Sequence, residues 1–90
     1  MKKILLILIL LLTIPFFSIS QTDSVKTYHK NGKLKSIGIL NNGKKDGVWK
    51  EYYDNNKLKI NETYKKGDLL NYKEYYDNGK LLSEGKYPDG

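Results

Sequence analysis

The sequence predicts an all-β fold in which antiparallel β-hairpin repeats form a meander in a single elongated sheet. The first observation is a repeat: three similar blocks begin at Tyr28, Tyr52 and Tyr75, at offsets of 24 and 23 residues. A fixed period of this length is typical of arrays of supersecondary units. The second observation is that apolar and polar residues after residue 20 alternate with a period of two, without helical periodicity.

The first element along the chain, residues 1–20, differs in composition from the repeats. Two lysines precede an apolar run from Ile4 to Phe17, and small serines follow at the positions that a signal peptidase recognises. The run has 14 residues, fewer than the roughly 17–25 needed to cross a bilayer. We therefore expect an N-terminal signal-peptide helix with cleavage near Ser20, rather than a membrane anchor. The mature chain, residues 21–90, is then expected to be exported and to be periplasmic or secreted.

Each repeat is predicted to be a β-hairpin plus its connection to the next one, over about 28–51, 52–74 and 75–90, with the third repeat truncated. The Asn-Gly pairs at 31–32 and 78–79 predict two-residue type I′ turns, because both central positions of that turn need positive φ. Asn55 and Asn56 occupy the same place, since Asn tolerates the left-handed region.

The alternating segments between these turns predict six strands, each of a normal length. The strands are expected at Val25–His29, Leu34–Leu40, Val48–Tyr53, Leu58–Tyr64, Leu69–Tyr76 and Leu81–Tyr87. The segment Asn41–Gly47 is expected to be the longest turn, and Lys66-Gly67 marks the next turn on that side.

One face of the strands that follow each Asn-rich turn is predicted to be packed. Its residues are Leu34, Ser36, Gly38 and Leu40, then Leu58, Ile60, Glu62 and Tyr64, then Leu81, Ser83, Gly85 and Tyr87. Gly38 and Gly85 leave room for an aromatic ring across the backbone. Glu62 interrupts the pattern, and we expect a Tyr or Lys partner beside it. The rings expected over the glycines, which are also the candidate binding surface, are Trp49, Tyr53, Tyr72 and Tyr76.

Composition argues against catalytic and metal sites. The chain has no Cys, and its only histidine, His29, stands where the other repeats have Tyr53 and Tyr76. We therefore predict no catalytic, cofactor-binding or metal-binding residues and no enzyme activity. Without residues 1–20, 14 Lys face 10 acidic residues, a net charge of +4 with no Arg. Because Arg is the usual residue for bidentate contacts to phosphates and bases, nucleic acid is not an expected partner.

The run GVWKEYYDNNKL from Gly47 to Leu58 resembles the variant MORN repeat, which has a Gly-x-Trp-x-x-Tyr-Tyr-x-x-Gly core. The resemblance covers Tyr28 to Gly90, and the middle copy departs from the pattern with Asn56 and Glu62 in place of glycine. It implies a meander of stacked antiparallel hairpins. Bacterial proteins of this kind are commonly labelled YwqK-type antitoxins, and MORN repeats elsewhere are described as protein-interaction, oligomerisation or membrane-lipid modules.

The leading functional hypothesis is an exported, non-catalytic binding or scaffold module of a bacterial cell envelope. One alternative is an antitoxin or immunity-type protein that neutralises a toxin by direct binding. A second is peripheral binding to anionic lipid or polysaccharide, such as an anionic membrane surface, through Lys. The expected partner is another protein or a second copy, bound through an exposed sheet edge or the Tyr-rich face. Residues 21–90 are predicted to be marginally stable alone and dimeric at micromolar concentration, because one open sheet has little core.

Overall fold

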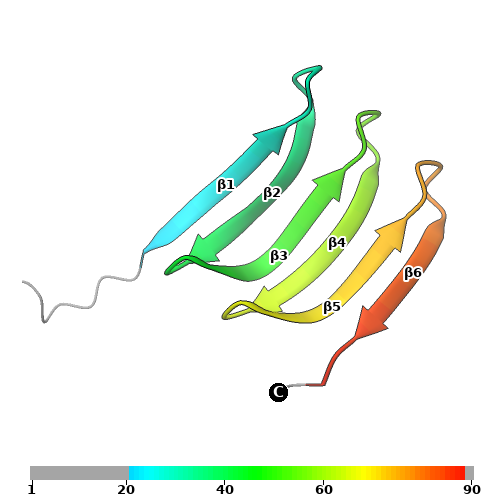
Figure 1. Cartoon of the computed structure of the whole chain (residues 1–90). Coiled ribbons are helices and arrows are strands. Elements are labelled where there is room, and N and C mark those ends of the chain that lie inside the picture. Colours follow the sequence, from blue (N-terminus) through cyan, green and yellow to red (C-terminus); the bar gives the residue numbers. More distant parts are fainter. Residues whose placement is uncertain (1–20, 89–90) are drawn as a thin grey trace, which may run out of the picture.

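Six strands in one antiparallel sheet make up the computed structural model, which describes residues 21–88 (Figure 1). Each strand pairs with the next one along the chain. The strands are β1 (Thr22–Tyr28), β2 (Leu34–Asn41), β3 (Lys44–Tyr52), β4 (Leu58–Lys65), β5 (Asp68–Tyr75) and β6 (Leu81–Lys86). The predicted six-stranded antiparallel meander is confirmed. The predicted signal-peptide helix lies outside the described residues.

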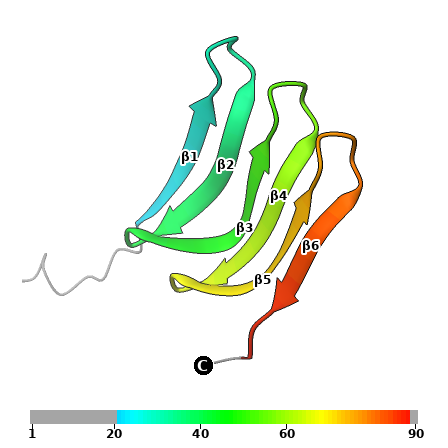
Figure 2. The ribbon, with the colours of Figure 1, turned by 45° about the vertical axis from the view of Figure 1, so that its right-hand side comes forward.

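The connections between strands are of two kinds, which lie at opposite ends of the sheet (Figure 2). Two-residue turns join β2 to β3 and β4 to β5. Both residues have positive φ in Asn42-Gly43 (52° and 79°) and in Lys66-Gly67 (50° and 89°). These are the φ values that a type I′ turn requires, and its twist matches that of the flanking strands.

The other three connections are three-residue loops, so the prediction of two-residue type I′ turns there is wrong. In the first loop, the Gly32 amide donates to the His29 carbonyl at 2.9 Å, and the His29 amide donates to the Lys33 carbonyl at 2.8 Å. Only Gly32 has positive φ, 87°. This is a type I turn closed by one left-handed residue. Asn56 and Gly79, with φ of 69° and 90°, close the other two loops in the same way.

Asn31, Asn55 and Asn78 stabilise these loops through their side chains rather than through a positive φ. The Lys33 amide donates to Asn31 Oδ1 at 2.9 Å, and the same bond recurs from Lys57 to Asn55 at 3.0 Å. An Asn side chain that accepts a hydrogen bond from the backbone two residues on stabilises a turn without a left-handed residue. The Asn-Gly pair is therefore used differently here than in a type I′ turn.

A one-residue β-bulge follows each of the three loops. The cross-strand pairs step from Glu51–Ile60 to Tyr52–Leu58, which leaves Lys59 as the extra residue. Register shifts at the equivalent places in the other two hairpins leave Lys35 and Leu82 as the extra residues. Such bulges bend the strand and increase its twist.

The bulges reverse the alternation of side chains at the start of β2, β4 and β6. Opposite partners in an antiparallel pair share a face, and Tyr52 directly follows Glu51, so its partner Leu58 faces away from Ile60. The prediction that Leu34, Leu58 and Leu81 lie on the face of the two glycines is therefore wrong. Counting along one strand misses the extra residue, because only the pairing with the neighbouring strand shows it.

The predicted long turn at Asn41–Gly47 is also wrong, because β3 begins at Lys44. The pairs Ile37–Lys50 and Ile39–Asp46 leave three residues of β3 opposite Gly38 alone. At the corresponding place between β4 and β5 the register shift is one residue. The one-residue difference between the offsets of 24 and 23 therefore lies in the bulge between the paired strands and not in a turn.

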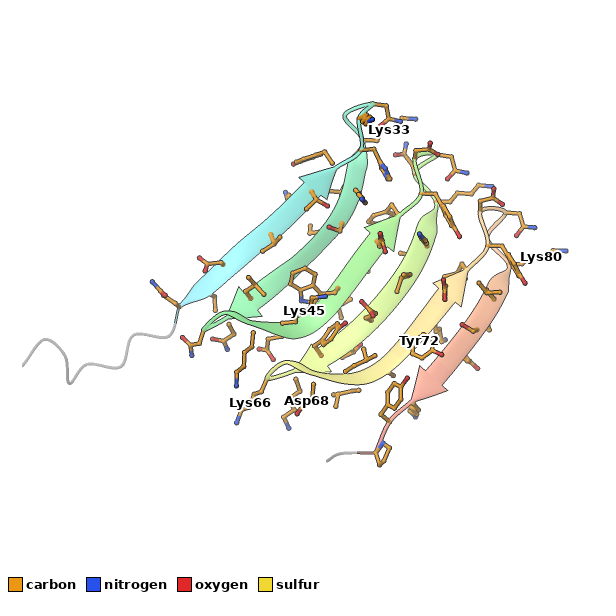
Figure 3. All side chains as sticks on the ribbon, in the orientation of Figure 1. Lys33, Lys45, Lys66, Asp68, Tyr72 and Lys80 are labelled. Atoms are coloured by element: carbon orange, nitrogen blue, oxygen red, sulfur yellow. The ribbon has the colours of Figure 1, made fainter. Side chains whose placement is uncertain are left out.

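The sheet has no second layer among residues 21–88, and no hydrophobic side chain is buried there. Gly38 is the only residue of this described part that is buried. Most residues of β4 and β5 are half-buried, whereas those of β1 and β6 are mainly exposed. Figure 3 labels Lys33 and Lys80 at the end with the loops and Lys66 at the end with the type I′ turns. Within the described residues, neither face of the sheet is covered by another element.

Candidate binding surface

Three aromatic side chains of the central strands, Trp49, Tyr64 and Tyr72, lie on one face of the sheet. Trp49 of β3 pairs with Glu62 of β4, which pairs with Tyr72 of β5, so these three side chains form a row on one face. We call this face the ring face. It is defined by Trp49, Tyr64, Tyr72 and Tyr87 together with Lys45 and Glu62.

Trp49 lies across the backbone of Gly38, as predicted. A Cβ at Gly38 would overlap the indole atoms Cδ2, Cε2 and Cε3. The indole N–H donates to the Ile39 carbonyl oxygen at 3.0 Å, which satisfies the polar group of a half-buried ring. Glycine in this place is therefore required by a close approach, and the ring covers a stretch of β2 that no second layer covers within residues 21–88.

Tyr72 lies against Gly85 of β6, also as predicted. A Cβ at Gly85 would lie 2.5 Å from Tyr72 Cε1. Tyr72 also stacks on Tyr87, with ring centroids 6.3 Å apart and an interplanar angle of 28°. Such pairs contribute about 0.5–1.5 kcal/mol beyond the area they bury. The ring face thus continues to the edge strand of the sheet.

Lys45 joins two rings of this face (Figure 3). Its Nζ lies 4.9 Å from the centroid of the Trp49 ring and 5.0 Å from that of Tyr64. Both distances are within the range of cation–π attraction. Sequence reasoning missed Lys45, because it placed the residue in a turn. The signal was present in the spacing, since Lys45 precedes Trp49 by four residues in an extended strand.

Glu62 stands between Trp49 and Tyr72 and interacts with Tyr64, which is the tyrosine partner expected for it. Burial raises the pKa of Tyr64 above its ordinary value of 10.0, and the charge of Glu62 and its hydrogen bond to the phenol raise it further. The Tyr64 phenol is therefore harder to deprotonate than that of an ordinary tyrosine. Glu62 places one negative charge in the middle of the aromatic row.

The other two predicted surface residues lie outside this row, each at the start of a loop. Tyr53 donates from Oη to the Tyr75 carbonyl oxygen at 2.7 Å, and Lys59 Nζ lies 5.6 Å from its ring centroid. Tyr76 holds the same place in the third hairpin and is 49% exposed. The four predicted residues thus form two groups: Trp49 and Tyr72 within the ring face, and Tyr53 and Tyr76 at the end of the sheet with the loops.

The opposite face carries most of its charge as lysine, and we call it the lysine face. One cross-strand row runs over all six strands and alternates lysine with other residues: Lys26, Ile37, Lys50, Asn61, Lys73 and Glu84. Ile37, Ile39 and Val48 line a shallow hollow on this face, and Ile39 and Val48 are 49% and 50% exposed. Sequence reasoning missed this hollow, although Ile37 and Ile39 have the spacing of one strand face.

The described part of the chain offers neither a cluster of metal ligands nor a membrane-spanning helix. No cluster of His, Asp and Glu suited to a metal ion occurs in residues 21–88. No helix in this range is long and apolar enough to span a membrane. His29 Nε2 lies 2.8 Å from the Tyr52 carbonyl oxygen, so this nitrogen carries the proton and is used in a structural bond.

Comparison with protein families matches the MORN repeat variant at residues 24–42, 45–66 and 70–87. Each match covers one hairpin with a three-residue loop, and together they cover more than half of the 90 residues. Neither the curated proteins nor the solved structures gave a match. MORN repeats suggest a binding or scaffold module, which agrees with a sheet whose two faces are uncovered within residues 21–88. The chain belongs to the MORN repeat variant family.

Proposed function

We propose that this chain is a non-enzymatic binding module that holds a partner protein against its ring face, in the envelope of a bacterial cell. The observation that carries the proposal is the half-buried row of Trp49 and Tyr72 on a sheet whose described residues place no second layer over it. Trp and Tyr are enriched in interfaces, because they offer a large contact area with a polar tip.

The chemistry of the ring face favours a protein over a small apolar ligand. Lys45 lies over Trp49, and Glu62 lies beside Tyr64. Glu51 and Glu74 lie on the same face, two residues along their strands from Trp49 and Tyr72. An apolar centre with a few charged groups that orient the partner is the usual composition of a protein–protein interface. A partner with basic side chains and one acidic side chain beside an apolar segment would complement this pattern.

Site-specific photo-crosslinking tests the proposal in cells. A photoreactive phenylalanine analogue replaces Tyr72 on the ring face or Lys73, its neighbour along β5 on the lysine face, as a matched control. We expect one adduct of a single protein from Tyr72, with at least a fivefold lower yield from Lys73. The same comparison at Trp49 and Val48 repeats the test on β3. Equal yields from the two faces, or no protein adduct from the ring face, would contradict the proposal.

The identity of the adduct separates the two kinds of protein partner. A toxin as the crosslinked protein, with its toxicity relieved by this chain, would establish the antitoxin or immunity alternative. Export is tested by the N-terminal sequence of the protein recovered from cells. We expect the chain to begin near Gln21, and a chain that retains residues 1–20 would contradict cleavage near Ser20.

The lysine face supports a second candidate function, peripheral contact with an anionic lipid or polysaccharide. Lys26, Lys50 and Lys73 lie on alternate strands of one row, about 10 Å apart from one to the next, given the usual strand spacing. Vesicles that contain anionic lipid should then sediment the protein at low salt and release it at high salt. Sedimentation that does not depend on lipid charge would remove this candidate.

A further inference from the structure

Neighbouring hairpins in this sheet are joined by a contact that recurs at the same place in each repeat. His29 donates from Nε2 to the Tyr52 carbonyl oxygen at 2.8 Å. Tyr53, at the corresponding place in the second repeat, donates from Oη to the Tyr75 carbonyl oxygen at 2.7 Å. In both cases the first residue after an odd-numbered strand reaches the last residue of the next odd-numbered strand.

A second contact recurs beside the first. Asn31 Nδ2 lies 3.4 Å from the Asp54 carbonyl oxygen, and Asn55 Nδ2 lies 3.4 Å from the Asp77 carbonyl oxygen. These hydrogen bonds are long and individually weak, but they hold the same positions in both repeats. Each of the first two loops therefore offers two side-chain donors to the loop that follows it.

The third loop offers the same two donors without an acceptor among residues 21–88. Tyr76 corresponds to Tyr53 and Asn78 to Asn55, and Tyr76 is 49% exposed. β6 has one neighbour in the sheet, β5, and β1 has one neighbour, β2. Within the described residues, each of these edge strands thus has one side of its backbone unpaired, and such an edge is a template for another strand.

We propose that copies of this chain join head to tail, with β6 of one copy paired antiparallel with β1 of the next, so that one sheet continues across copies. This assembly is independent of the partner of the ring face. β1 corresponds to β3 and β5 in the repeat, because Tyr28 ends β1 as Tyr52 ends β3 and Tyr75 ends β5. β3 and β5 each follow an even-numbered strand in the sheet, so β1 of the next copy can follow β6 in the same way. Tyr76 and Asn78 of one copy then donate to the carbonyl oxygens of Tyr28 and Lys30 of the next.

The register of this junction follows from the pairing already present between β4 and β5. There, Asn61 pairs with Lys73, and Glu62 pairs with Tyr72. Transfer of these pairs by one repeat places Glu84 of β6 opposite Lys26 of β1. The next pair is then Gly85 with Val25. The opposite charges meet on the lysine face, and an opposite-charge pair directly across two strands is stabilising.

Charge favours the head-to-tail junction of β6 with β1 over the two symmetric junctions, β1 with β1 and β6 with β6. A β1–β1 junction brings Lys26 of both copies to one edge, and a β6–β6 junction does the same with Glu84. Like charges directly opposite in a sheet are destabilising. In neither symmetric junction does Tyr76 meet the last residue of an odd-numbered strand in the register of the repeat, so the recurring hydrogen bond would not form. A head-to-tail contact between unlike surfaces does not close on itself unless its rotation allows a ring, so we expect open chains of variable length.

Disulfide trapping tests the register directly, since the chain has no cysteine of its own. The full chain with Lys26→Cys is mixed with the full chain with Glu84→Cys and oxidised mildly. Opposite residues in an antiparallel pair have Cα atoms about 4.5–5.5 Å apart, which a disulfide spans. We expect a crosslinked dimer of the two variants, at least tenfold more abundant than with Thr27→Cys in place of Lys26→Cys. Thr27 is the adjacent residue and lies on the other face.

Each other outcome overturns the proposal. Equal yields from Lys26→Cys and Thr27→Cys would mean random collision, and a predominance of Glu84→Cys homodimers would mean a symmetric edge contact. No dimer at any concentration would mean that the edges do not pair.

Charge reversal provides a second, reversible readout in sedimentation velocity. Glu84→Lys should weaken association about fivefold, the effect of roughly 1 kcal/mol, and the double change Glu84→Lys with Lys26→Glu should restore it. The double variant also shows that loss of association in Glu84→Lys does not come from misfolding. A double variant that associates no better than Glu84→Lys alone would contradict the pairing of these two residues.

Discussion

Two glycines occupy the same place in their repeats, but their rings come from opposite sides. Trp49, which lies over Gly38, belongs to β3, the strand after that glycine. Tyr72, which lies against Gly85, belongs to β5, the strand before that glycine. The repeat therefore determines where the glycines and rings stand along the chain, but not which glycine a ring covers.

The residue between the two rings accounts for the difference. Glu62 holds the glycine place in the middle repeat, and it pairs with both Trp49 and Tyr72. Its side chain occupies the space over β4, so Trp49 lies toward β2 and Tyr72 toward β6. A ring in this sheet is thus directed by the absence of a Cβ on one of its two neighbouring strands.

Alanine in place of either glycine should destabilise the sheet, and more so at Gly38 than at Gly85. Gly38→Ala should lower the free energy of unfolding by about 1–3 kcal/mol, the usual cost of overpacking, because three indole atoms and the bond from Trp49 to Ile39 must shift. Gly85→Ala should cost less, since Tyr72 meets the new Cβ with one atom inside 3.0 Å and lies beside the edge strand. Urea unfolding of both variants checks the order, and an equal or larger cost for Gly85→Ala would reject it.

The two rings also differ in charge, because Lys45 lies over Trp49, whereas no cation lies over Tyr72 among residues 21–88. Lys45→Gln should destabilise the protein by about 0.5–1 kcal/mol, the value of a cation–π contact at an exposed site. Lys50→Gln, on the lysine face and paired with the uncharged Ile37 and Asn61, is the matched control and should change stability by less than about 0.5 kcal/mol. Equal losses in thermal unfolding would show that Lys45 stabilises only through general charge.

Glu62, the residue between the two rings, should influence the titration of Tyr64 and through it the stability at high pH. The folded-state pKa of Tyr64 is raised, so above pH 10 the unfolded chain releases this proton more readily than the folded one. This contribution to stability is therefore complete below pH 10 and is lost as pH rises through the folded-state pKa. Glu62→Gln removes the charge, and phenolate absorbance should show that Tyr64 then titrates at lower pH. Tyr64→Phe identifies its signal, and an unchanged titration in Glu62→Gln would contradict the contact.

The parts of the fold that depend on order along the chain could be predicted from the sequence. The spacing of Tyr28, Tyr52 and Tyr75 predicted the repeat, and the positions of Gly38 and Gly85 predicted where rings would cross the backbone. These features are local, because a glycine without a Cβ and an aromatic residue of the right parity can be recognised in one strand at a time.

The parts that depend on pairing between strands could not be predicted in this way. The extra residue at Lys59 is defined only by its neighbours across β3, so the reversed orientation of Leu58 has no signal in the alternation along β4. Asn31 was predicted to have a positive φ, but only Gly32 has one in this loop. Asn31 stabilises the turn by accepting a hydrogen bond from the Lys33 amide. Lys45 was predicted to lie in a turn, but its pairing with Leu40 of β2 makes it part of β3.

A double-mutant cycle between Gly38→Ala and Trp49→Thr measures how strongly a ring over a glycine stabilises a sheet that has no buried hydrophobic side chain among residues 21–88. Gly38→Ala should cost about 1–3 kcal/mol with Trp49 present. With Thr there instead, it should cost nothing or stabilise slightly, because Ala is favoured over Gly in a strand once the ring is gone. An equal cost of Gly38→Ala in both backgrounds would contradict the account.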